Sequence, residues 1–179
     1  MYNQIEKELK ILVSKKDYET IVNSYEFSSP WAQTNTYYDT PNGYVRSLNG
    51  ACRIRSIGSK KIFTLKIRIS PDSHIELEKE INVDSMKEIK DEEVLGWIQK
   101  YEIPLNELAP IISFTTNRRI VDLENAELCA DETIFASHTD YEIEYEYKKI
   151  HNGIEEFNKI LETIGKQYEK NCPSKIARA

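Results

Sequence analysis

The sequence of 179 residues is poor in cysteine, in long apolar runs and in net positive charge. Its three cysteines, Cys52, Cys129 and Cys172, show no CxxC or other metal-ligand spacing, which argues against a disulfide framework and a zinc knuckle. We expect buried free thiols in a reducing compartment, and therefore a cytoplasmic protein. No stretch resembles a signal peptide or a membrane-spanning helix.

The chain also lacks the basic excess of general nucleic-acid and anionic-membrane binders, because its net charge is -6. We therefore expect neither kind of partner. Internal repeats, low-complexity tracts and domain linkers are absent from the sequence. With 40% hydrophobic and 30% charged residues, the composition is that of a globular protein, and the length fits one domain over residues 1–179.

Alternating apolar residues and turn signals divide the chain into strands and a few helices. Helices are expected from Ser14 to about Tyr25, from Asp84-Ser85 to about Tyr101, and from Asn152 to Ile164. The strands are expected at 5–11, 34–40, 51–57, 62–69, 74–83, 111–123, 127–135 and 141–150. This order predicts an α+β domain dominated by antiparallel, hairpin-connected strands.

Several of these strands carry charge along one face and apolar residues along the other. In the first strand, Glu6, Glu8 and Lys10 share a face, opposite isoleucine and leucine side chains. The same pattern recurs in two acidic rows (Glu76, Glu78 and Glu80; Glu142, Glu144 and Glu146) and in two basic rows (Arg53 and Arg55; Lys66 and Arg68).

Charges of one sign rarely line one face of a solvated strand. Carboxylates two residues apart lie roughly 7 Å from each other, so at an effective dielectric constant near 20 each pair repels by about 2 to 3 kcal/mol. A divalent cation between them would offset this repulsion, and rows of Arg and Lys can grip successive phosphates. Closing the sheet around both rows would give a tunnel with a polar interior and helices packed outside. The alternative is an ordinary barrel whose charges point into water.

This series of residues resembles the CYTH, or triphosphate tunnel metalloenzyme, superfamily, whose hallmark is an N-terminal Glu-x-Glu-x-Lys strand, here Glu6, Glu8 and Lys10. The resemblance implies an eight-stranded antiparallel closed β-barrel that acts on triphosphate compounds with Mg2+ or Mn2+. It extends through most of the chain, in the order Tyr38-Asp39-Thr40, Arg53-x-Arg55, Lys66-x-Arg68, Glu78-x-Glu80, Arg118, Asp131, Glu142-x-Glu144 and Lys175.

The resemblance also implies a role for each matching position. The metal ligands would be Glu6, Glu8, Asp131, Glu142 and Glu144. The phosphate-binding residues would be Lys10, Arg53, Arg55, Lys66, Arg68 and Arg118, with Lys175 closing one end of the tunnel. The catalytic residues would be Glu6, Glu8, Lys66 and Arg55. The acidic rows add further candidates, Glu76, Glu78, Glu80 and Glu146.

Two of these assignments depend on strand register. Arg118 precedes Arg119, and Asp131 precedes Glu132, so a shift of one residue would exchange the side chain that faces inward. The histidines fall at turns or strand ends and are expected on the surface: His74, His138 and His151.

The expected function is hydrolysis of inorganic triphosphate, or of a small nucleoside or thiamine triphosphate, by water attack on a phosphoryl group held inside the tunnel. Two alternatives stay open. One is a class IV-type adenylate cyclase that converts ATP to cyclic AMP and pyrophosphate, and the other is a non-catalytic module that binds triphosphate or polyphosphate. The residues do not choose between Mg2+ and Mn2+, or between a monomer and a homodimer.

Overall fold

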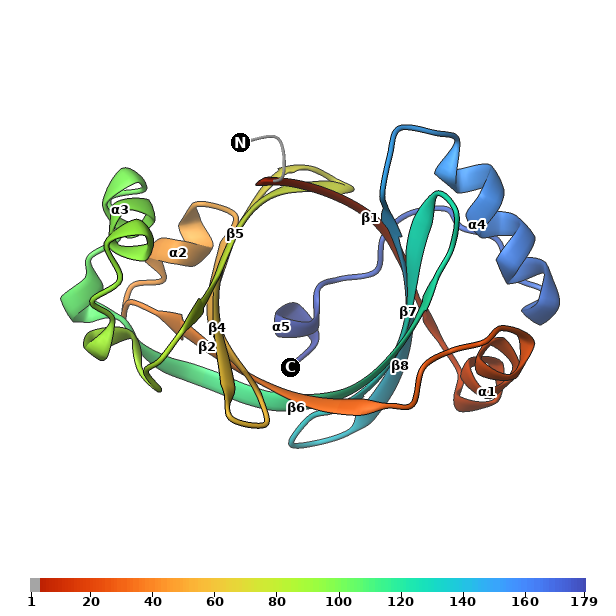
Figure 1. Ribbon diagram of the computed structural model, residues 1–179, viewed down its shortest axis with the longest axis horizontal. Helices are drawn as coiled ribbons and strands as arrows, with labels where there is room; N and C mark the ends of the chain where they lie inside the picture. The colour runs from red at the N-terminus through yellow and green to blue at the C-terminus, as the bar shows by residue number, and fades with distance from the viewer. Residues whose placement is uncertain (1–3) are drawn as a thin grey trace.

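The computed structural model describes residues 4–179, in which eight antiparallel strands close into a barrel (Figure 1). The strands are β1 (Ile5–Val13), β2 (Trp31–Asp39), β3 (Gly50–Ile57), β4 (Lys60–Ser70), β5 (Ser73–Ile81), β6 (Ala109–Asp122), β7 (Ala126–Ile134) and β8 (Thr139–Tyr147). Their order around the ring is β1-β5-β4-β3-β2-β6-β7-β8, which puts β1 and β2 on opposite walls. The predicted closed barrel is confirmed.

Five α-helices accompany the barrel: α1 (Lys15–Ser24), α2 (Tyr44–Ser47), α3 (Glu92–Lys100), α4 (Gly153–Leu161) and α5 (Lys175–Arg178). Viewed along the barrel axis, α2 and α3 lie outside one side of the ring, and α1 and α4 lie outside the opposite side (Figure 1). The hydroxyl of Ser14 accepts a hydrogen bond from the backbone N–H of Asp17, so the predicted cap of α1 is confirmed.

The helix predicted from Asp84-Ser85 is wrong in its first half. The chain forms a 3-10 turn over Met86–Glu88, and α3 begins only at Glu92. The carboxylate of Asp91 accepts hydrogen bonds from the backbone N–H groups of Glu93 and Val94, which makes it the N-cap of the shorter helix.

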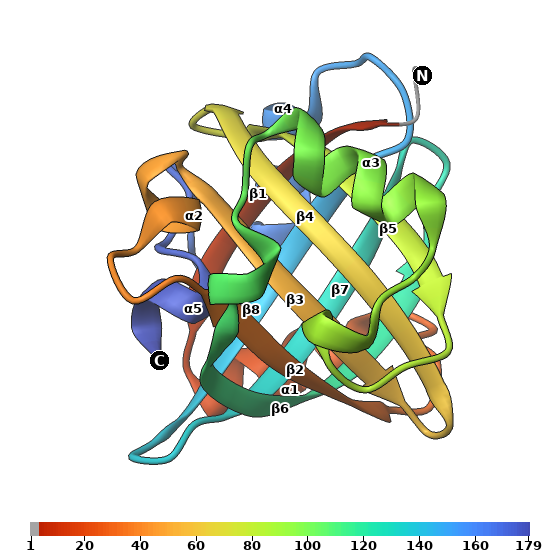
Figure 2. The same ribbon diagram turned by 90° about the vertical axis from the view of Figure 1, so that its left-hand side faces the viewer.

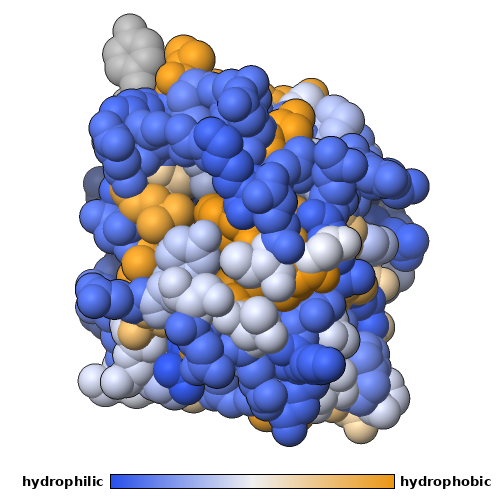
Figure 3. All heavy atoms as spheres, turned by 90° about the vertical axis from the view of Figure 1, so that its right-hand side faces the viewer, coloured by the Kyte–Doolittle hydropathy of each residue, from blue (hydrophilic) through white to orange (hydrophobic). Residues whose placement is uncertain are grey.

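The apolar faces of β1, β3, β4, β5, β7 and β8 point outward, where helices cover them. One cluster of buried residues packs β3, β4 and β5 against α2 and α3 and includes Phe63 and Val94, which are both fully buried. A second packs β1, β7 and β8 against α1 and α4 and includes Leu9, Tyr145 and Phe157. On this second side, hydrophobic residues reach the surface as a patch between hydrophilic ones (Figure 3). Because helices take up the outer faces, the inner surface is left to the charged rows.

The C-terminal segment returns to the barrel. The side-chain amide of Asn171 accepts a hydrogen bond from the N–H of Lys10 (2.9 Å) and donates to the carbonyls of Glu8 (3.0 Å) and Pro71 (3.2 Å). It thereby ties β1 to the turn between β4 and β5. The short helix α5 follows and lies inside the ring in Figure 1 and at one end of the barrel in Figure 2.

In the described part of the chain, no helix is long and apolar enough to span a membrane. The three cysteines are free thiols, as predicted. Cys52 and Cys129 are also buried as expected, whereas Cys172 is only partly buried.

Candidate functional site in the barrel lumen

The charged rows line the inside of the barrel. Residues that pair across neighbouring antiparallel strands lie on the same face of a sheet, so the register decides which side chains meet. Glu8 pairs with Glu146 across β1 and β8, and Lys66 pairs with Glu76 across β4 and β5. The acidic rows therefore occupy β1, β5 and β8, whereas the arginines of β3 and β6 belong to the other walls.

Lys66 lies among three carboxylates from β1 and β5. Its Nζ is 2.6 Å from Glu6 Oε1, 3.6 Å from Glu8 Oε1 and 3.5 Å from Glu76 Oε2. Burial disfavours the charged amine, but Glu8 and the other carboxylates outweigh burial and raise the pKa of Lys66. Lys10 Nζ lies 3.2 Å from the same oxygen of Glu8. Two ammonium groups thus supply positive charge to this acidic wall.

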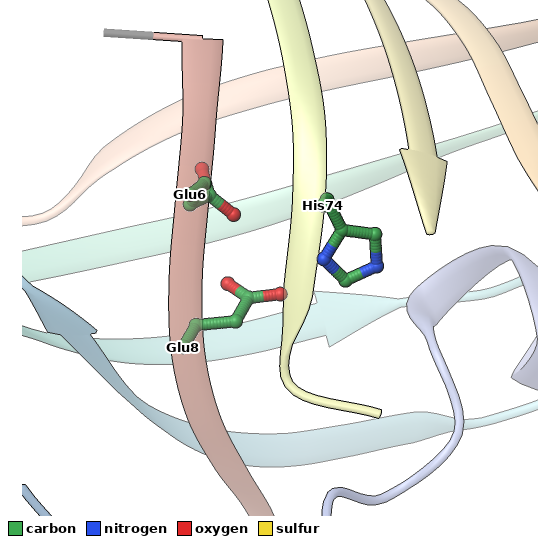
Figure 4. Close-up of side chains that lie close together, drawn as sticks. All are labelled: Glu6, Glu8 and His74. Atoms are coloured by element: carbon green, nitrogen blue, oxygen red, sulfur yellow. The ribbon is translucent and has the colours of Figure 1, made fainter. Parts of the chain in front are cut away.

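Glu6 and Glu8 share their side of the lumen with His74 of β5 (Figure 4). One potential ligand atom from each residue lies within 4.8 Å of the others. Burial and then the charge of Lys66 lower the pKa of His74 to about 4, which keeps the imidazole neutral at neutral pH. Two carboxylates and a neutral imidazole form a donor set that suits a divalent metal.

A second acidic cluster consists of Asp131, Glu142 and Glu144, all buried and with ligand atoms within 4.8 Å of one another. Arg118 donates to both carboxylate oxygens of Asp131 (2.8 and 2.7 Å) and to Glu144 (3.0 Å). Lys175 Nζ contacts all three carboxylates, at 2.9 Å from Asp131, 3.2 Å from Glu142 and 2.6 Å from Glu144. Positive side chains from β6 and α5 therefore neutralise this cluster.

The two glutamates of this cluster differ in proton affinity. Burial raises the pKa of Glu142 to about 7, against the lowering effect of Lys175 and with a further rise from Glu144. Burial acts in the same direction on Glu144, but Lys175 and Arg118 outweigh it and hold its pKa well below the usual range. The pKa of Glu142 therefore lies near neutral pH, whereas the adjacent Glu144 stays ionised.

α5 is fixed in the barrel mouth by more than Lys175. Arg178 Nη2 lies 2.5 Å from Glu142 Oε2, and its Nε donates to Asp140 at 2.9 Å. Ile176 packs against a small apolar cluster of Tyr37, Phe114 and Phe135. The predicted position of Lys175 at one end of the barrel agrees with this arrangement.

The arginines of β3 face neutral partners. Arg55 Nε donates to Asn35 Oδ1 at 2.8 Å, and Arg53 Nη1 donates to the hydroxyl of Tyr37 at 3.4 Å. Burial, and then the charges of Arg53 and Arg118, lower the pKa of Arg55 to about 9. This wall therefore carries positive charge in excess of the anions that face it.

Three buried donor atoms on β2 and β3 have no hydrogen-bond partner among the described residues: Gln33 Nε2, Asn35 Nδ2 and Arg53 Nε. On the acidic side, Glu6 Oε1 has only its ion pair with Lys66, without hydrogen-bond geometry, and His74 Nδ1 has no partner. Leaving a buried polar group unpaired costs about 1–3 kcal/mol. Among the described residues, the lumen thus holds unpaired donors on the wall of β2 and β3 and carboxylates on the opposite wall.

The register resolves both ambiguities left by the sequence. Arg118 faces inward to Asp131, whereas Arg119 reaches outward to the carbonyl of Ser28 (3.4 Å). Asp131 is fully buried, and its neighbour Glu132 accepts a hydrogen bond from Asn117 on the other face. Both inward orientations are the predicted ones.

The remaining basic and acidic candidates lie away from the two clusters. Glu78 accepts a hydrogen bond from Thr64 at 2.9 Å, Glu80 lies 3.8 Å from the half-exposed Lys60, and Arg68 is exposed. The structure therefore does not bring Arg68, Glu78 and Glu80 into either cluster.

Glu146 forms a third group with Glu127 and Cys129 of β7, again with ligand atoms within 4.8 Å of one another. Burial and then the nearby charge of Glu6 raise the pKa of Glu146 to about 8. This group lies next to Glu8, the cross-strand partner of Glu146, and extends the acidic wall.

Sequence reasoning missed three lumen residues: His74, Gln33 and Asn35. The expectation of surface histidines is correct for His138 but wrong for His74 and for His151, which hydrogen-bonds to the Tyr145 hydroxyl at 2.7 Å. Period-two alternation could have found His74, because it extends the inward face of Glu76.

Comparison with known proteins agrees with this architecture. The sequence model of the CYTH domain matches residues 4–179. The protein named "Putative triphosphatase YjbK" of Bacillus subtilis (strain 168) is 25% identical over 167 residues, which cover 90% of this chain and 87% of that protein.

Two solved structures show the same fold. One is described as a "putative adenylate cyclase" from Bacillus halodurans and superimposes with a TM-score of 0.83, at 24% identity, covering 98% of this chain and 97% of that one. The other, from Hippeastrum, is described as a "putative adenylyl cyclase" with a dominant triphosphatase activity; its TM-score is 0.76, at 23% identity, with 97% and 93% of the chains covered. Since the family match spans all of the described residues, this chain belongs to the CYTH domain family.

Proposed function

We propose that this chain, with residues 1–179 as one catalytic domain, is a divalent-metal-dependent triphosphatase that hydrolyses inorganic triphosphate or a similar small triphosphate. One observation carries the proposal, namely the division of the lumen between two opposed walls. Unpaired donors and excess positive charge lie on β2 and β3, whereas carboxylates lie on β1, β5 and β8. A chelated triphosphate matches both walls, because its oxygens accept hydrogen bonds and its cation takes carboxylate ligands.

The acidic residues fit a hard divalent ion. Glu6 and Glu8 of β1, and Asp131, Glu142 and Glu144 of β7 and β8, offer oxygen donors in compact groups. Bound Mg2+ or Mn2+ would neutralise phosphate charge and lower the pKa of a bound water. Lys66 and Lys175 hold the ion-pair positions at these groups in the structure, so both side chains have to share or give up carboxylate oxygens when a cation binds.

The basic residues would bind the phosphates and neutralise their charge. Arg53, Arg55 and Arg118 would hold the phosphoryl oxygens, and Lys66 would offset the charge that develops on the leaving group. The oxygen of water forms a bond to the terminal phosphorus while the bond from that phosphorus to its bridging oxygen breaks. Inorganic triphosphate and water thereby give orthophosphate and diphosphate. Positioning and charge neutralisation supply the rate enhancement, as in other phosphoryl transfers.

Phosphate release tests this proposal directly. The purified chain is assayed with inorganic triphosphate, ATP and thiamine triphosphate, each with Mg2+ and with Mn2+. We expect Glu8→Gln to lower the rate by about 100-fold or more, since it removes a charged group at the reacting centre. Glu19→Gln, on the exposed face of α1, is the matched control and should leave the rate unchanged. A folded protein that binds triphosphate but releases no phosphate from any of these compounds would instead be a binding module.

An adenylate cyclase is the second candidate, because the two solved structures compared above are described with a cyclase name. Cyclisation needs the ribose 3'-oxygen of ATP as the nucleophile in place of water. Chromatography of the products from ATP separates the two reactions. Cyclic AMP with pyrophosphate would identify a cyclase, whereas ADP with orthophosphate would identify a hydrolase.

We also propose that the protein works in the cytoplasm. Its three cysteines are free thiols, and free thiols persist in reducing compartments.

A further inference from the structure

Gln33 is a buried polar residue that sequence patterns gave no reason to select. It lies on β2 opposite Thr116 of β6, and its side chain is on the inner face because the adjacent Thr34 pairs outward with Thr115. Only 2% of Gln33 is exposed, and its Nε2 has no hydrogen-bond partner among the described residues. A buried amide donor without a partner destabilises the fold, so its presence calls for a physical reason.

The neighbours of Gln33 indicate what such a donor would meet. Asn35, next along the inner face, is 1% exposed and has an unpaired Nδ2, while its Oδ1 holds Arg55. Arg118 pairs with Trp31 on the other side of Gln33, and its charge acts on Arg55. Cross-strand pairing thus places Arg55 opposite Asn35 and Arg118 opposite Trp31, one on each side of Gln33 along β2.

The alternative partners available inside the protein do not satisfy Gln33. The hydroxyl of Thr116, its cross-strand neighbour, is engaged with the hydroxyl of Thr133 at 2.9 Å. The Asn35 carbonyl oxygen accepts from Arg55. These two acceptors on β2 and β6 are thus already engaged, so a water molecule or a ligand that enters the lumen can supply the acceptor for Gln33 Nε2.

We propose that Gln33, supported by Asn35, is a substrate-binding residue that donates a hydrogen bond to a phosphoryl oxygen of a triphosphate held between Arg55 and Arg118. The inference rests on the proposed function and extends it to the wall opposite β1. A neutral amide adds a directed hydrogen bond without adding to the repulsion among the arginines. β2 therefore binds the end of the triphosphate that lies farthest from the carboxylates of β1.

This role predicts that Gln33→Met, which keeps the side-chain size but removes the donor, weakens triphosphate binding without lowering the stability of the free protein. In the free protein the unpaired donor is removed, so Tm should stay equal or rise by about 2–4 °C. The Kd for inorganic triphosphate, measured by calorimetry in EDTA so that metal-dependent turnover is prevented, should rise about 10-fold because one hydrogen bond to a charged group is lost. A purely structural glutamine would give the reverse pattern, a lower Tm and an unchanged Kd.

Thr34→Val is the matched control on the same strand. It removes a hydroxyl from the outer face and should leave the Kd for triphosphate unchanged. Gln33→Leu repeats the test with a smaller side chain if the Met variant does not fold. Adenosine, which lacks phosphates, should not bind more weakly to the Gln33 variants than to the wild type.

The outcomes separate this inference from the proposed function. If the wild type binds triphosphate and both Gln33 variants bind it equally well, the inference is wrong while the triphosphatase assignment stands. A Gln33-dependent affinity for adenosine would assign the amide to base recognition and also overturn it. If the wild type binds no triphosphate in EDTA, the inference is wrong, and the triphosphatase proposal falls with it only if the wild type also releases no phosphate with Mg2+ or Mn2+.

Discussion

Lys175 Nζ lies 2.6 Å from Glu144 Oε1, which brings the last helix of the chain into contact with the last strand of the barrel. The same ammonium also contacts Asp131 and Glu142, so one C-terminal side chain bridges three buried carboxylates. Burial disfavours its charge, yet these carboxylates raise the pKa of Lys175 well above its usual value. The acidic cluster is therefore balanced by a cation that belongs to the protein itself.

Replacing this cation should make the cluster depend on metal. Lys175→Met leaves Glu142 and Glu144 buried without their shared partner, and removing one member of a buried ion pair costs about 3–5 kcal/mol. We expect a lower free energy of unfolding in EDTA and a larger stabilisation by Mn2+ than in the wild type. Urea unfolding with and without Mn2+ measures both effects.

The control for this experiment is Lys159→Met, which removes an exposed lysine of α4 paired with Glu155 at 3.7 Å. Exposed pairs contribute about 0–1 kcal/mol, so its unfolding curve should stay close to that of the wild type in both conditions. Equal Mn2+ stabilisation of Lys175→Met and the wild type would contradict the prediction.

The partly buried Glu146 should make the metal-free protein less stable at alkaline pH. Burial and the nearby carboxylates raise its pKa to about 8 in the folded chain, from the ordinary value of 4.5. Between these pH values the folded state keeps a proton that the unfolded state releases, so stability is full below about pH 4.5 and is lost as the pH rises through 8. The difference between pKa values of 4.5 and about 8 corresponds to at most about 5 kcal/mol, which solvent screening of this partly buried carboxylate reduces. Urea unfolding in EDTA at acidic, neutral and alkaline pH measures the loss.

Glu146→Gln tests the source of this pH dependence. A neutral amide cannot ionise, so the difference in stability between acidic and alkaline pH should shrink relative to the wild type. Glu19→Gln changes an exposed glutamate and should preserve the wild-type dependence. Parallel curves for Glu146→Gln and the wild type would show that another group is responsible.

Asn171 should contribute more to stability than a typical surface asparagine. Its amide bonds three backbone groups, the N–H of Lys10 and the carbonyls of Glu8 and Pro71, near the place where β1 changes from pairing with β5 to pairing with β8. Asn171→Ala leaves these groups without that partner, at an expected cost of about 2–3 kcal/mol in the free energy of unfolding.

Chemical denaturation compares this variant with Asn23→Ala, which alters an exposed position of α1. The control should change the free energy of unfolding by less than about 0.5 kcal/mol. If both variants unfold at the same denaturant concentration, the C-terminal segment does not hold the barrel at β1.

Much of the fold could be predicted because alternation has a physical cause. In a strand, neighbouring side chains point to opposite faces, so Glu6, Glu8 and Lys10 had to lie on one face and Leu9 on the other. Helices with apolar stripes can cover only the apolar face. The barrel with its charged interior follows from these two facts together with the family resemblance.

The helix boundaries were less predictable, because local caps compete. Asp84-Ser85 and Asp91 both precede segments that can form a helix, and the structure uses Asp91. The carboxylate of Asp91 satisfies two backbone N–H groups at once, at 3.0 and 3.1 Å, which gives it the advantage.

The sequence by itself determined which residues share a face: the acidic rows of β1, β5 and β8 and the basic rows of β3 and β4. Only the tertiary structure decided which of these rows meet. Closure of the ring pairs Glu8 with Glu146, and the return of the chain end places Lys175 against Glu144. Closure of the ring also leaves one side-chain nitrogen of Gln33 and one of His74 buried without a hydrogen-bond partner among residues 4–179. The reason is that period-two alternation fixes direction along one strand, whereas contacts between distant strands depend on register and on closure of the barrel.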